Sequence, residues 1–168
     1  MKTTLAIAAL TAFAVSTGAA LAAKPKPIEQ FKNWGAYTFD DKSRGKVCYI
    51  LAVPNAKAPA DRDHGDVYFL VSAKTTKAYE TQVEVGYELK DGEDVSVQIG
   101  KRSFEMFTKN NHAWLKDTAK EDALVAAMRK GSVMKVSARS KKGTQTSYTY
   151  SLSGVTAALR AIRNCPKG

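Results

Sequence analysis

The sequence has little of the chemistry on which most enzymes depend. Only two histidines, His64 and His112, occur among its 168 residues. It has no glycine-rich phosphate loop, no dinucleotide fingerprint and no G-x-S-x-G nucleophile motif, and spacing marks out no pair of carboxylates. Cofactor-dependent enzymes and the common hydrolases are therefore disfavoured. We expect no catalytic residue and no cofactor.

Metal ligands are equally scarce. The two cysteines, Cys48 and Cys165, lie far apart and fit neither a zinc site nor a redox C-x-x-C motif. The segment Asp61–Asp66 contains three aspartates, but it lacks the register of an EF-hand, and Arg62 adds a competing cation. We interpret this segment as a solvated loop and expect no metal site.

Acidic residues are missing from the last quarter of the chain. The whole sequence has 26 lysines and arginines against 16 aspartates and glutamates, with a formal net charge of +10. Nine basic residues follow Asp122 and no acidic residue does. Such an asymmetry can create a surface that attracts anionic partners; the alternative is that the charge only keeps the protein soluble. The residues expected to form this surface are Arg139, Lys141 and Lys142, with Arg160 and Arg163 as extensions.

Only one long apolar run is present, and it lies at the N-terminus. Lys2 precedes an apolar segment from Leu5 to Val15, and the small residues Ala20-Leu21-Ala22 close it. This pattern predicts a cleaved secretory signal peptide over residues 1–22. The run is shorter than the roughly 20 apolar residues of a membrane-spanning helix, and no later segment is apolar enough to span. We expect a single domain over residues 23–168 that is periplasmic, or secreted and associated with the outer surface of a bacterium.

Two cysteines in an exported chain have one intramolecular pairing available. A disulfide between Cys48 and Cys165 closes a loop of about 117 residues, for which loop-closure entropy is worth roughly 4–5 kcal/mol. The alternative is two buried free thiols.

Period-two alternation dominates the remaining sequence and predicts strands. Thr118 and Glu121 form a capping-box pattern at the start of a helix that ends at Gly131. Ser153 can cap a second helix, and Pro166 prevents its continuation. We therefore expect a mainly β fold, an antiparallel sandwich with two short helices, one in the last third before a strand and one C-terminal. The strands are expected over residues 47–53, 67–73, 81–89, 95–99, 103–108, 134–138 and 144–152.

Several short segments, taken in order, resemble one known family. They are Trp34, Cys48-Tyr49-Ile50 with Pro54, Gly86-Tyr87-Glu88-Leu89, Phe104-Glu105-Met106-Phe107 with Ala113-Trp114, Ala126-Ala127-Met128-Arg129-Lys130-Gly131, Ser140, Gly143-Thr144, Tyr150-Ser151-Leu152-Ser153-Gly154, Ala157-Ala158-Leu159 and Cys165. Together they are similar to the invasion-associated locus B family of exported bacterial proteins. The resemblance implies an immunoglobulin-like sandwich, a structural disulfide between the two cysteines and a link to host-cell invasion and virulence. It supplies no catalytic residues.

These observations favour a non-enzymatic interaction protein of the cell envelope. Its expected partner is an unknown protein or anionic envelope or host material, with peripheral contact at a membrane surface and without nucleic acid. One alternative is an envelope hydrolase, or an inhibitor of one, with a cleft near His64 or His112. The other is a structural envelope component without a discrete ligand.

Overall fold

Strands make up most of the computed structural model, which describes residues 24–163. The predicted signal peptide and Cys165 lie outside the described residues. A short 3-10 turn at Thr118–Lys120 leads into the first helix. The elements are β1 (Lys26–Phe31), β2 (Trp34–Asp41), β3 (Gly45–Ala52), β4 (Ala56–Ala58), β5 (Tyr68–Ala73), β6 (Tyr79–Glu84), β7 (Val95–Ile99), β8 (Arg102–Lys109), β9 (His112–Leu115), α1 (Glu121–Lys130), β10 (Val133–Arg139), β11 (Gln145–Ser151) and α2 (Val155–Ile162).

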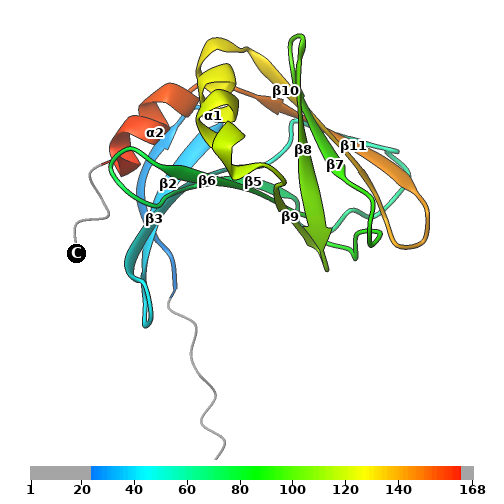
Figure 1. Ribbon diagram of the computed structural model, residues 1–168, viewed down its shortest axis with the longest axis horizontal. Coiled ribbons are helices and arrows are strands. Elements are labelled where there is room, and N and C mark those ends of the chain that lie inside the picture. Colours follow the sequence, from blue (N-terminus) through cyan, green and yellow to red (C-terminus); the bar gives the residue numbers. More distant parts are fainter. Residues whose placement is uncertain (1–23, 164–168) are drawn as a thin grey trace, which may run out of the picture.

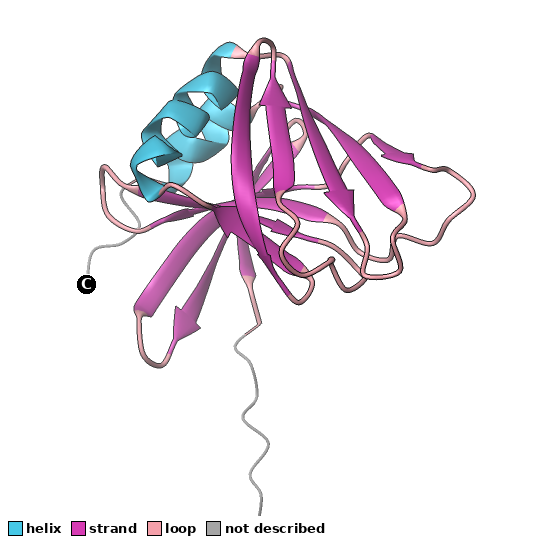
Figure 2. Ribbon diagram, turned by 45° about the vertical axis from the view of Figure 1, so that its right-hand side comes forward, coloured by secondary structure: helices cyan, strands magenta, loops and turns pink. Residues whose placement is uncertain are grey.

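The strands form one antiparallel sheet of 11 strands in the order β1-β2-β3-β5-β6-β9-β8-β7-β10-β11-β4 (Figures 1 and 2). The prediction of a mainly β fold with two short helices is confirmed, and the neighbouring strands β7 and β8 form a hairpin. The hydrogen bonds join all described strands into one sheet, so two separate sheets of an immunoglobulin-like sandwich are not shown.

The two halves of the sheet face each other across the core. Trp34 on β2 is fully buried, and its Nε1 donates a hydrogen bond to the carbonyl oxygen of Ser151 on β11 at 3.0 Å. Phe69 on β5 packs edge-on against Tyr150 on β11, with ring centroids 6.0 Å apart. Because these contacts join strands that are distant in the sheet order, the sheet folds back on itself and buries the apolar side chains of its inner face.

Both helices lie on the same side of the first half of the sheet (Figure 1). Helix α2 contacts β1, β2 and β3, and α1 contacts β6 and α2. Each helix buries one apolar stripe, as amphipathic helices on a sheet do. The fully buried members of these stripes are Leu124 and Met128 on α1 and Ala158, Leu159 and Ile162 on α2.

The predicted helix caps are wrong in detail. The side chain of Asp117, not Thr118, accepts the capping hydrogen bond, from the backbone N–H of Ala119. The carboxylate of Glu121 instead accepts from the backbone N–H of Thr81 on β6, at 3.1 and 3.2 Å. At α2 the N-cap is Gly154 rather than Ser153, with φ of 98° and no side-chain cap. Tertiary contacts with neighbouring strands therefore override the local capping pattern.

Candidate functional site

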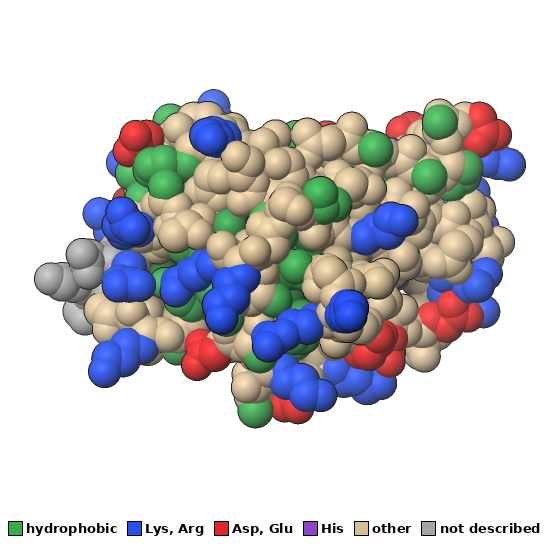
Figure 3. Space-filling view, turned by 90° about the horizontal axis from the view of Figure 1, so that it is seen from above, with side chains coloured by type: hydrophobic (Ala, Val, Ile, Leu, Met, Phe, Trp, Pro, Cys, Tyr) green, Lys and Arg blue, Asp and Glu red, His purple; other side chains and the backbone are tan. Residues whose placement is uncertain are grey.

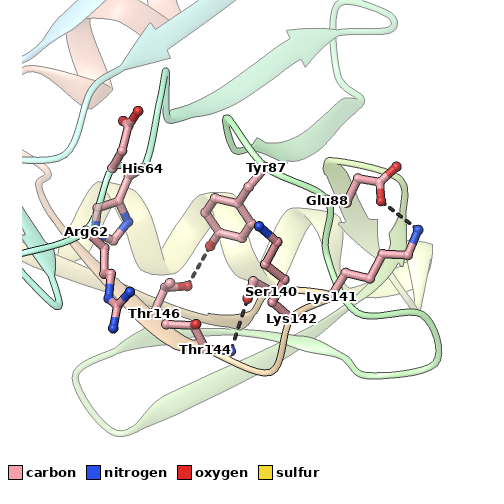
Figure 4. A pocket seen from close by; sticks show the side chains of 10 residues that line it. Arg62, His64, Tyr87, Glu88, Ser140, Lys141, Lys142, Thr144 and Thr146 are labelled. Atoms are coloured by element: carbon pink, nitrogen blue, oxygen red, sulfur yellow. Dashed lines mark hydrogen bonds and ion pairs between the residues drawn. The ribbon is translucent and has the colours of Figure 1, made fainter.

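A cavity of about 380 Å³ opens beside the turn that joins β10 to β11 (Figure 4). One wall is the loop that precedes β5 and contributes Arg62 and His64. Tyr87 and Glu88, which follow β6, and the segment from Ser140 to Thr146 supply the rest of the lining. Two of the basic residues predicted from the sequence, Lys141 and Lys142, lie in this lining, and Arg139 ends the strand next to it.

Carboxylates neutralise two of these three cations. Arg139 Nε lies 2.7 Å from Glu93 Oε2, and Lys141 Nζ lies 2.7 Å from Glu88 Oε2. The hydrogen bond between Lys141 and Glu88 lowers the pKa of the Glu88 carboxyl and raises that of the lysine. Both partners of this pair are 64% exposed, so it adds little to stability. Within residues 24–163, Lys142 forms no ion pair.

A chain of hydrogen-bonded side chains underlies the cavity. His64 Nε2 lies 2.9 Å from the carbonyl oxygen of Pro59, and its Nδ1 lies 2.9 Å from the hydroxyl of Tyr148. The Tyr148 hydroxyl contacts that of Tyr87 at 2.7 Å, and Tyr87 contacts Thr146 Oγ1 at 2.6 Å. Burial is the main cause that raises the pKa of Tyr148. Of these four side chains only Tyr87 is half-buried, and His64, Tyr87 and Thr146 all line the cavity.

The two histidines do not meet. His64 is 5% exposed and both of its ring nitrogens are engaged in the network. His112 lies on β9, where its ring stacks on Trp114 at 5.5 Å and its Nε2 lies 3.7 Å from Glu84 Oε2. A general base needs a nitrogen within reach of the proton that it removes. Both nitrogens of His64 already have partners inside the fold, whereas His112 is half-buried beside Glu84.

Arg160 and Arg163 lie away from the β10–β11 turn. Arg160 lies on α2 and Arg163 directly follows it, on the opposite side of the molecule in Figure 1. Arg163 lines a groove of about 540 Å³ beside α1, together with Lys77 and Arg129. The five basic residues predicted from the sequence therefore fall into two groups, and the structure does not join them into one surface.

Further basic residues that were not predicted from the sequence line grooves beside α1. A further groove of about 650 Å³ on the other side of α1 is lined by Lys101, Arg102 and Lys130. We call the seven residues around the two helices the helical basic face, and the space-filling view shows lysine and arginine side chains gathered over this side (Figure 3). The cue in the sequence was the pair Arg129-Lys130 at the end of α1, but the other members come from distant turns. The helical basic face consists of Lys77, Lys101, Arg102, Arg129, Lys130, Arg160 and Arg163.

The cations of the helical basic face differ from those of the turn in their pairing. Across residues 24–163, none of the seven forms an ion pair with a carboxylate. The guanidinium of Arg129 lies 5.8 Å from the centroid of the Tyr79 ring, and this cation–π contact orients its planar fork. Asp122 is the one acidic residue that lines either groove.

The described part of the chain holds no group of three or more side chains suited to a metal ion. No helix within residues 24–163 is long and apolar enough to cross a membrane.

Comparison with known proteins places the chain in a family. Residues 34–163 match the family model of the invasion associated locus B (IalB) protein. The chain belongs to the IalB family. Its fold is similar to the crystal structure of invasion associated protein b from Bartonella henselae, with a TM-score of 0.59 and 16% identity over 80% of this chain and 94% of that one. A comparison with curated proteins finds no match.

The family assignment confirms the resemblance seen in the sequence. Trp34, the first residue of the matched region, is a central core residue of this IalB-family fold. Cys48 is fully buried on β3, while Cys165 lies outside the described residues, so the predicted disulfide stays a prediction. The family name refers to invasion and does not specify a molecular function.

Proposed function

We propose that this IalB-family protein is an exported, non-enzymatic interaction protein of the bacterial cell envelope. It is periplasmic, or secreted and associated with the outer surface, and it binds anionic envelope or host material. The N-terminal signal pattern supports export, and the family name supports a role at the host surface. The fold-back of the sheet onto β11 supports an immunoglobulin-like sandwich as the scaffold.

The contact surface that we propose is the helical basic face. A cation already paired with a carboxylate contributes little field at a distance, whereas unpaired cations on one side of a molecule add their potentials. The turn holds paired cations at Arg139 and Lys141. The absence of ion pairs among the seven residues of the helical basic face, within the described part of the chain, is the observation that carries the proposal.

The environment of His64 supports binding over hydrolysis. A histidine-based hydrolase needs a ring nitrogen that faces the substrate. In His64 both nitrogens are hydrogen-bonded to Pro59 and Tyr148, and the ring is buried. We therefore expect His64→Asn to change the free energy of unfolding. We do not expect it to remove a catalytic activity.

The test compares two double variants that each remove two positive charges. Lys130→Gln with Arg163→Gln removes exposed, unpaired charges of the helical basic face. Lys141→Gln with Lys142→Gln removes the same charge from the turn. Because a basic side chain near an anionic surface is worth about 1 kcal/mol, the first variant should bind heparin, or vesicles with anionic lipid, about 10-fold or more weakly. The second should lose less than about 3-fold.

Each arm of this test can contradict the proposal. Equal losses in both double variants mean that net charge, not the helical basic face, determines binding. Binding that survives high salt excludes an electrostatic surface, since screened charges no longer attract. Absence of binding to both probes favours a structural envelope component. Heparin and vesicles together distinguish host-type glycan from envelope lipid.

A further inference from the structure

The cavity beside the β10–β11 turn lies outside the helical basic face, and it combines charged and hydroxyl groups in a small volume. We propose that it binds one acidic sugar unit, a sugar ring that carries a single anionic group. This inference does not rest on the helical basic face. Its volume of about 380 Å³ falls within the range of pockets that hold small molecules. Three independent features of the lining specify the ligand.

The first feature is a pair of cations on opposite walls. Arg62 extends from the loop before β5, and Lys142 from the turn, and Figure 4 shows both beside the hydroxyl groups of the cavity. Lys142 has no carboxylate partner within residues 24–163, and Arg62 has only a contact of 3.9 Å with Asp61 between exposed side chains. Such a contact is weak. An anionic group of a ligand in the cavity can therefore pair with either cation.

The acidic residues of the lining do not compete for these two cations. Glu88 is held by Lys141 at 2.7 Å. Asp63 Oδ1 accepts a hydrogen bond from the backbone N–H of Gly65 at 2.8 Å, within its own loop. The cavity therefore keeps two cationic side chains for a ligand, in addition to a lysine that is already paired.

The second feature is the number of hydrogens in the buried network. His64, Tyr148, Tyr87 and Thr146 link the carbonyl oxygens of Pro59 and Ala138 through five contacts. With a neutral imidazole, these four side chains supply four hydrogens, one from the ring and one from each hydroxyl. If the other four contacts each hold a hydrogen, the contact between Tyr87 and Thr146 has none, and both of these oxygens can still accept one. A ligand hydroxyl can donate to either oxygen, and an anion without a hydrogen cannot.

An unpartnered hydroxyl adds to this second feature. Thr144 lines the cavity, and within residues 24–163 only its backbone is engaged: its N–H donates to Ser140 Oγ at 3.0 Å, and its carbonyl oxygen accepts from the N–H of Ser140 at 2.9 Å. Its side-chain hydroxyl can donate to or accept from a ligand hydroxyl. A ring with several hydroxyls and one charge satisfies Thr144, the network and the two cations together. This combination distinguishes an acidic sugar from a simple anion or a neutral sugar.

The third feature is the fixed position of the walls. The backbone N–H of Gly86 donates to the carbonyl oxygen of His64 at 3.1 Å. A Cβ at Gly86 would lie 2.5 Å from the Cα of Gly65, so two glycines are required for this close approach of loop and strand. The loop that carries Arg62 is thereby held against the segment that carries Tyr87. A site whose walls are already in place loses less entropy when it binds a small ligand.

The experiment is a titration of the full mature chain, followed by calorimetry or by amide chemical shifts. The probes are glucuronate, glucose and sulfate, which carries no hydroxyl at pH 7. We expect saturable binding of glucuronate, with glucose and sulfate each about 10-fold weaker or more, because glucose lacks the charge and sulfate lacks the hydroxyl groups. Sulfate binding as tight as glucuronate binding identifies a simple anion site and overturns the proposal. Absence of saturable glucuronate binding to the folded protein does the same.

Two variants with matched controls test the assigned residues. Lys142→Gln should weaken glucuronate binding about 10-fold, whereas Lys46→Gln, an exposed lysine on β3, should leave it unchanged. Tyr87→Phe should weaken it about 3-fold or more, whereas Tyr49→Phe should not. If the variants bind as wild type does, the cavity is not the site.

The helical basic face supplies the last comparison. Lys130→Gln with Arg163→Gln should weaken the polymer binding described above about 10-fold or more and leave glucuronate binding unchanged. Failure of the polymer test alone therefore leaves this inference standing, and a parallel loss of both kinds of binding contradicts it.

Discussion

Two tyrosines on β11 offer a sharp test of the buried hydroxyl network. Tyr148 and Tyr150 point into the same core and are both fully buried. The hydroxyl of Tyr148 contacts His64 Nδ1 at 2.9 Å and the hydroxyl of Tyr87 at 2.7 Å. The hydroxyl of Tyr150 has no hydrogen-bond partner within residues 24–163. Burial raises the pKa of both phenols, so both are neutral at pH 7.

The same chemical change should therefore have opposite effects at the two positions. In Tyr148→Phe two hydrogen bonds are lost, each worth about 0.5–1.5 kcal/mol net, so the free energy of unfolding should fall by about 1–3 kcal/mol. The upper part of this range applies because His64 Nδ1 is left buried without a partner. In Tyr150→Phe the ring still fills its space, and an unpaired buried hydroxyl is removed. That variant should be as stable as wild type or up to about 1 kcal/mol more stable.

Urea unfolding at pH 7 measures both differences. The slope of the free energy against urea concentration should be unchanged in both variants, because the surface exposed on unfolding is the same. Equal losses of stability in the two variants would refute the hydrogen-bond argument. A loss at Tyr150 alone would show that its hydroxyl has a partner and that the network has been placed on the wrong tyrosine.

Three further predictions concern the framework around the site. Glu121→Gln should raise the free energy of unfolding at pH 7. Burial raises the pKa of the Glu121 carboxyl above its ordinary 4.5, so the wild-type protein loses stability as the pH rises through that region. In urea unfolding, the advantage of the variant should therefore vanish below pH 4.5. Gly154→Ala should lower stability by about 2 kcal/mol or more, because φ is 98° and a Cβ overlaps the carbonyl of Phe31; an unchanged melting curve would contradict this geometry. Reduction of the predicted Cys48–Cys165 disulfide should cost about 4 kcal/mol and change mobility in a non-reducing gel, and identical mobility would exclude the bond.

Alternation of apolar residues predicted the strands of the core well and the edges of the sheet poorly. The strands β3, β5, β7, β8, β10 and β11 all lie within or close to predicted segments. Four strands, β1, β2, β4 and the short central strand β9, coincide with no predicted segment. The strand β2 has aromatic side chains, Tyr37 and Phe39, on its outer face, which hides the period of two. The predicted strand 81–89 instead ends at Glu84, because Gly86 turns against the backbone of Gly65.

The predicted anion-binding residues show why such a surface cannot be inferred from charge along the chain. The last quarter lacks acidic residues, but folding brings carboxylates to it from earlier segments. Glu88 precedes Lys141 by 53 residues, and Glu93 precedes Arg139 by 46. These pairs neutralise the positive charge of the turn that looked most basic. In the grooves beside α1 and α2, the one acidic lining residue is Asp122. The quantity that determines attraction is the charge that stays unpaired after folding. By that measure the contact surface that we propose is the helical basic face and not the β10–β11 turn. The cavity beside the turn would recognise one small ligand by its shape and its hydroxyl groups.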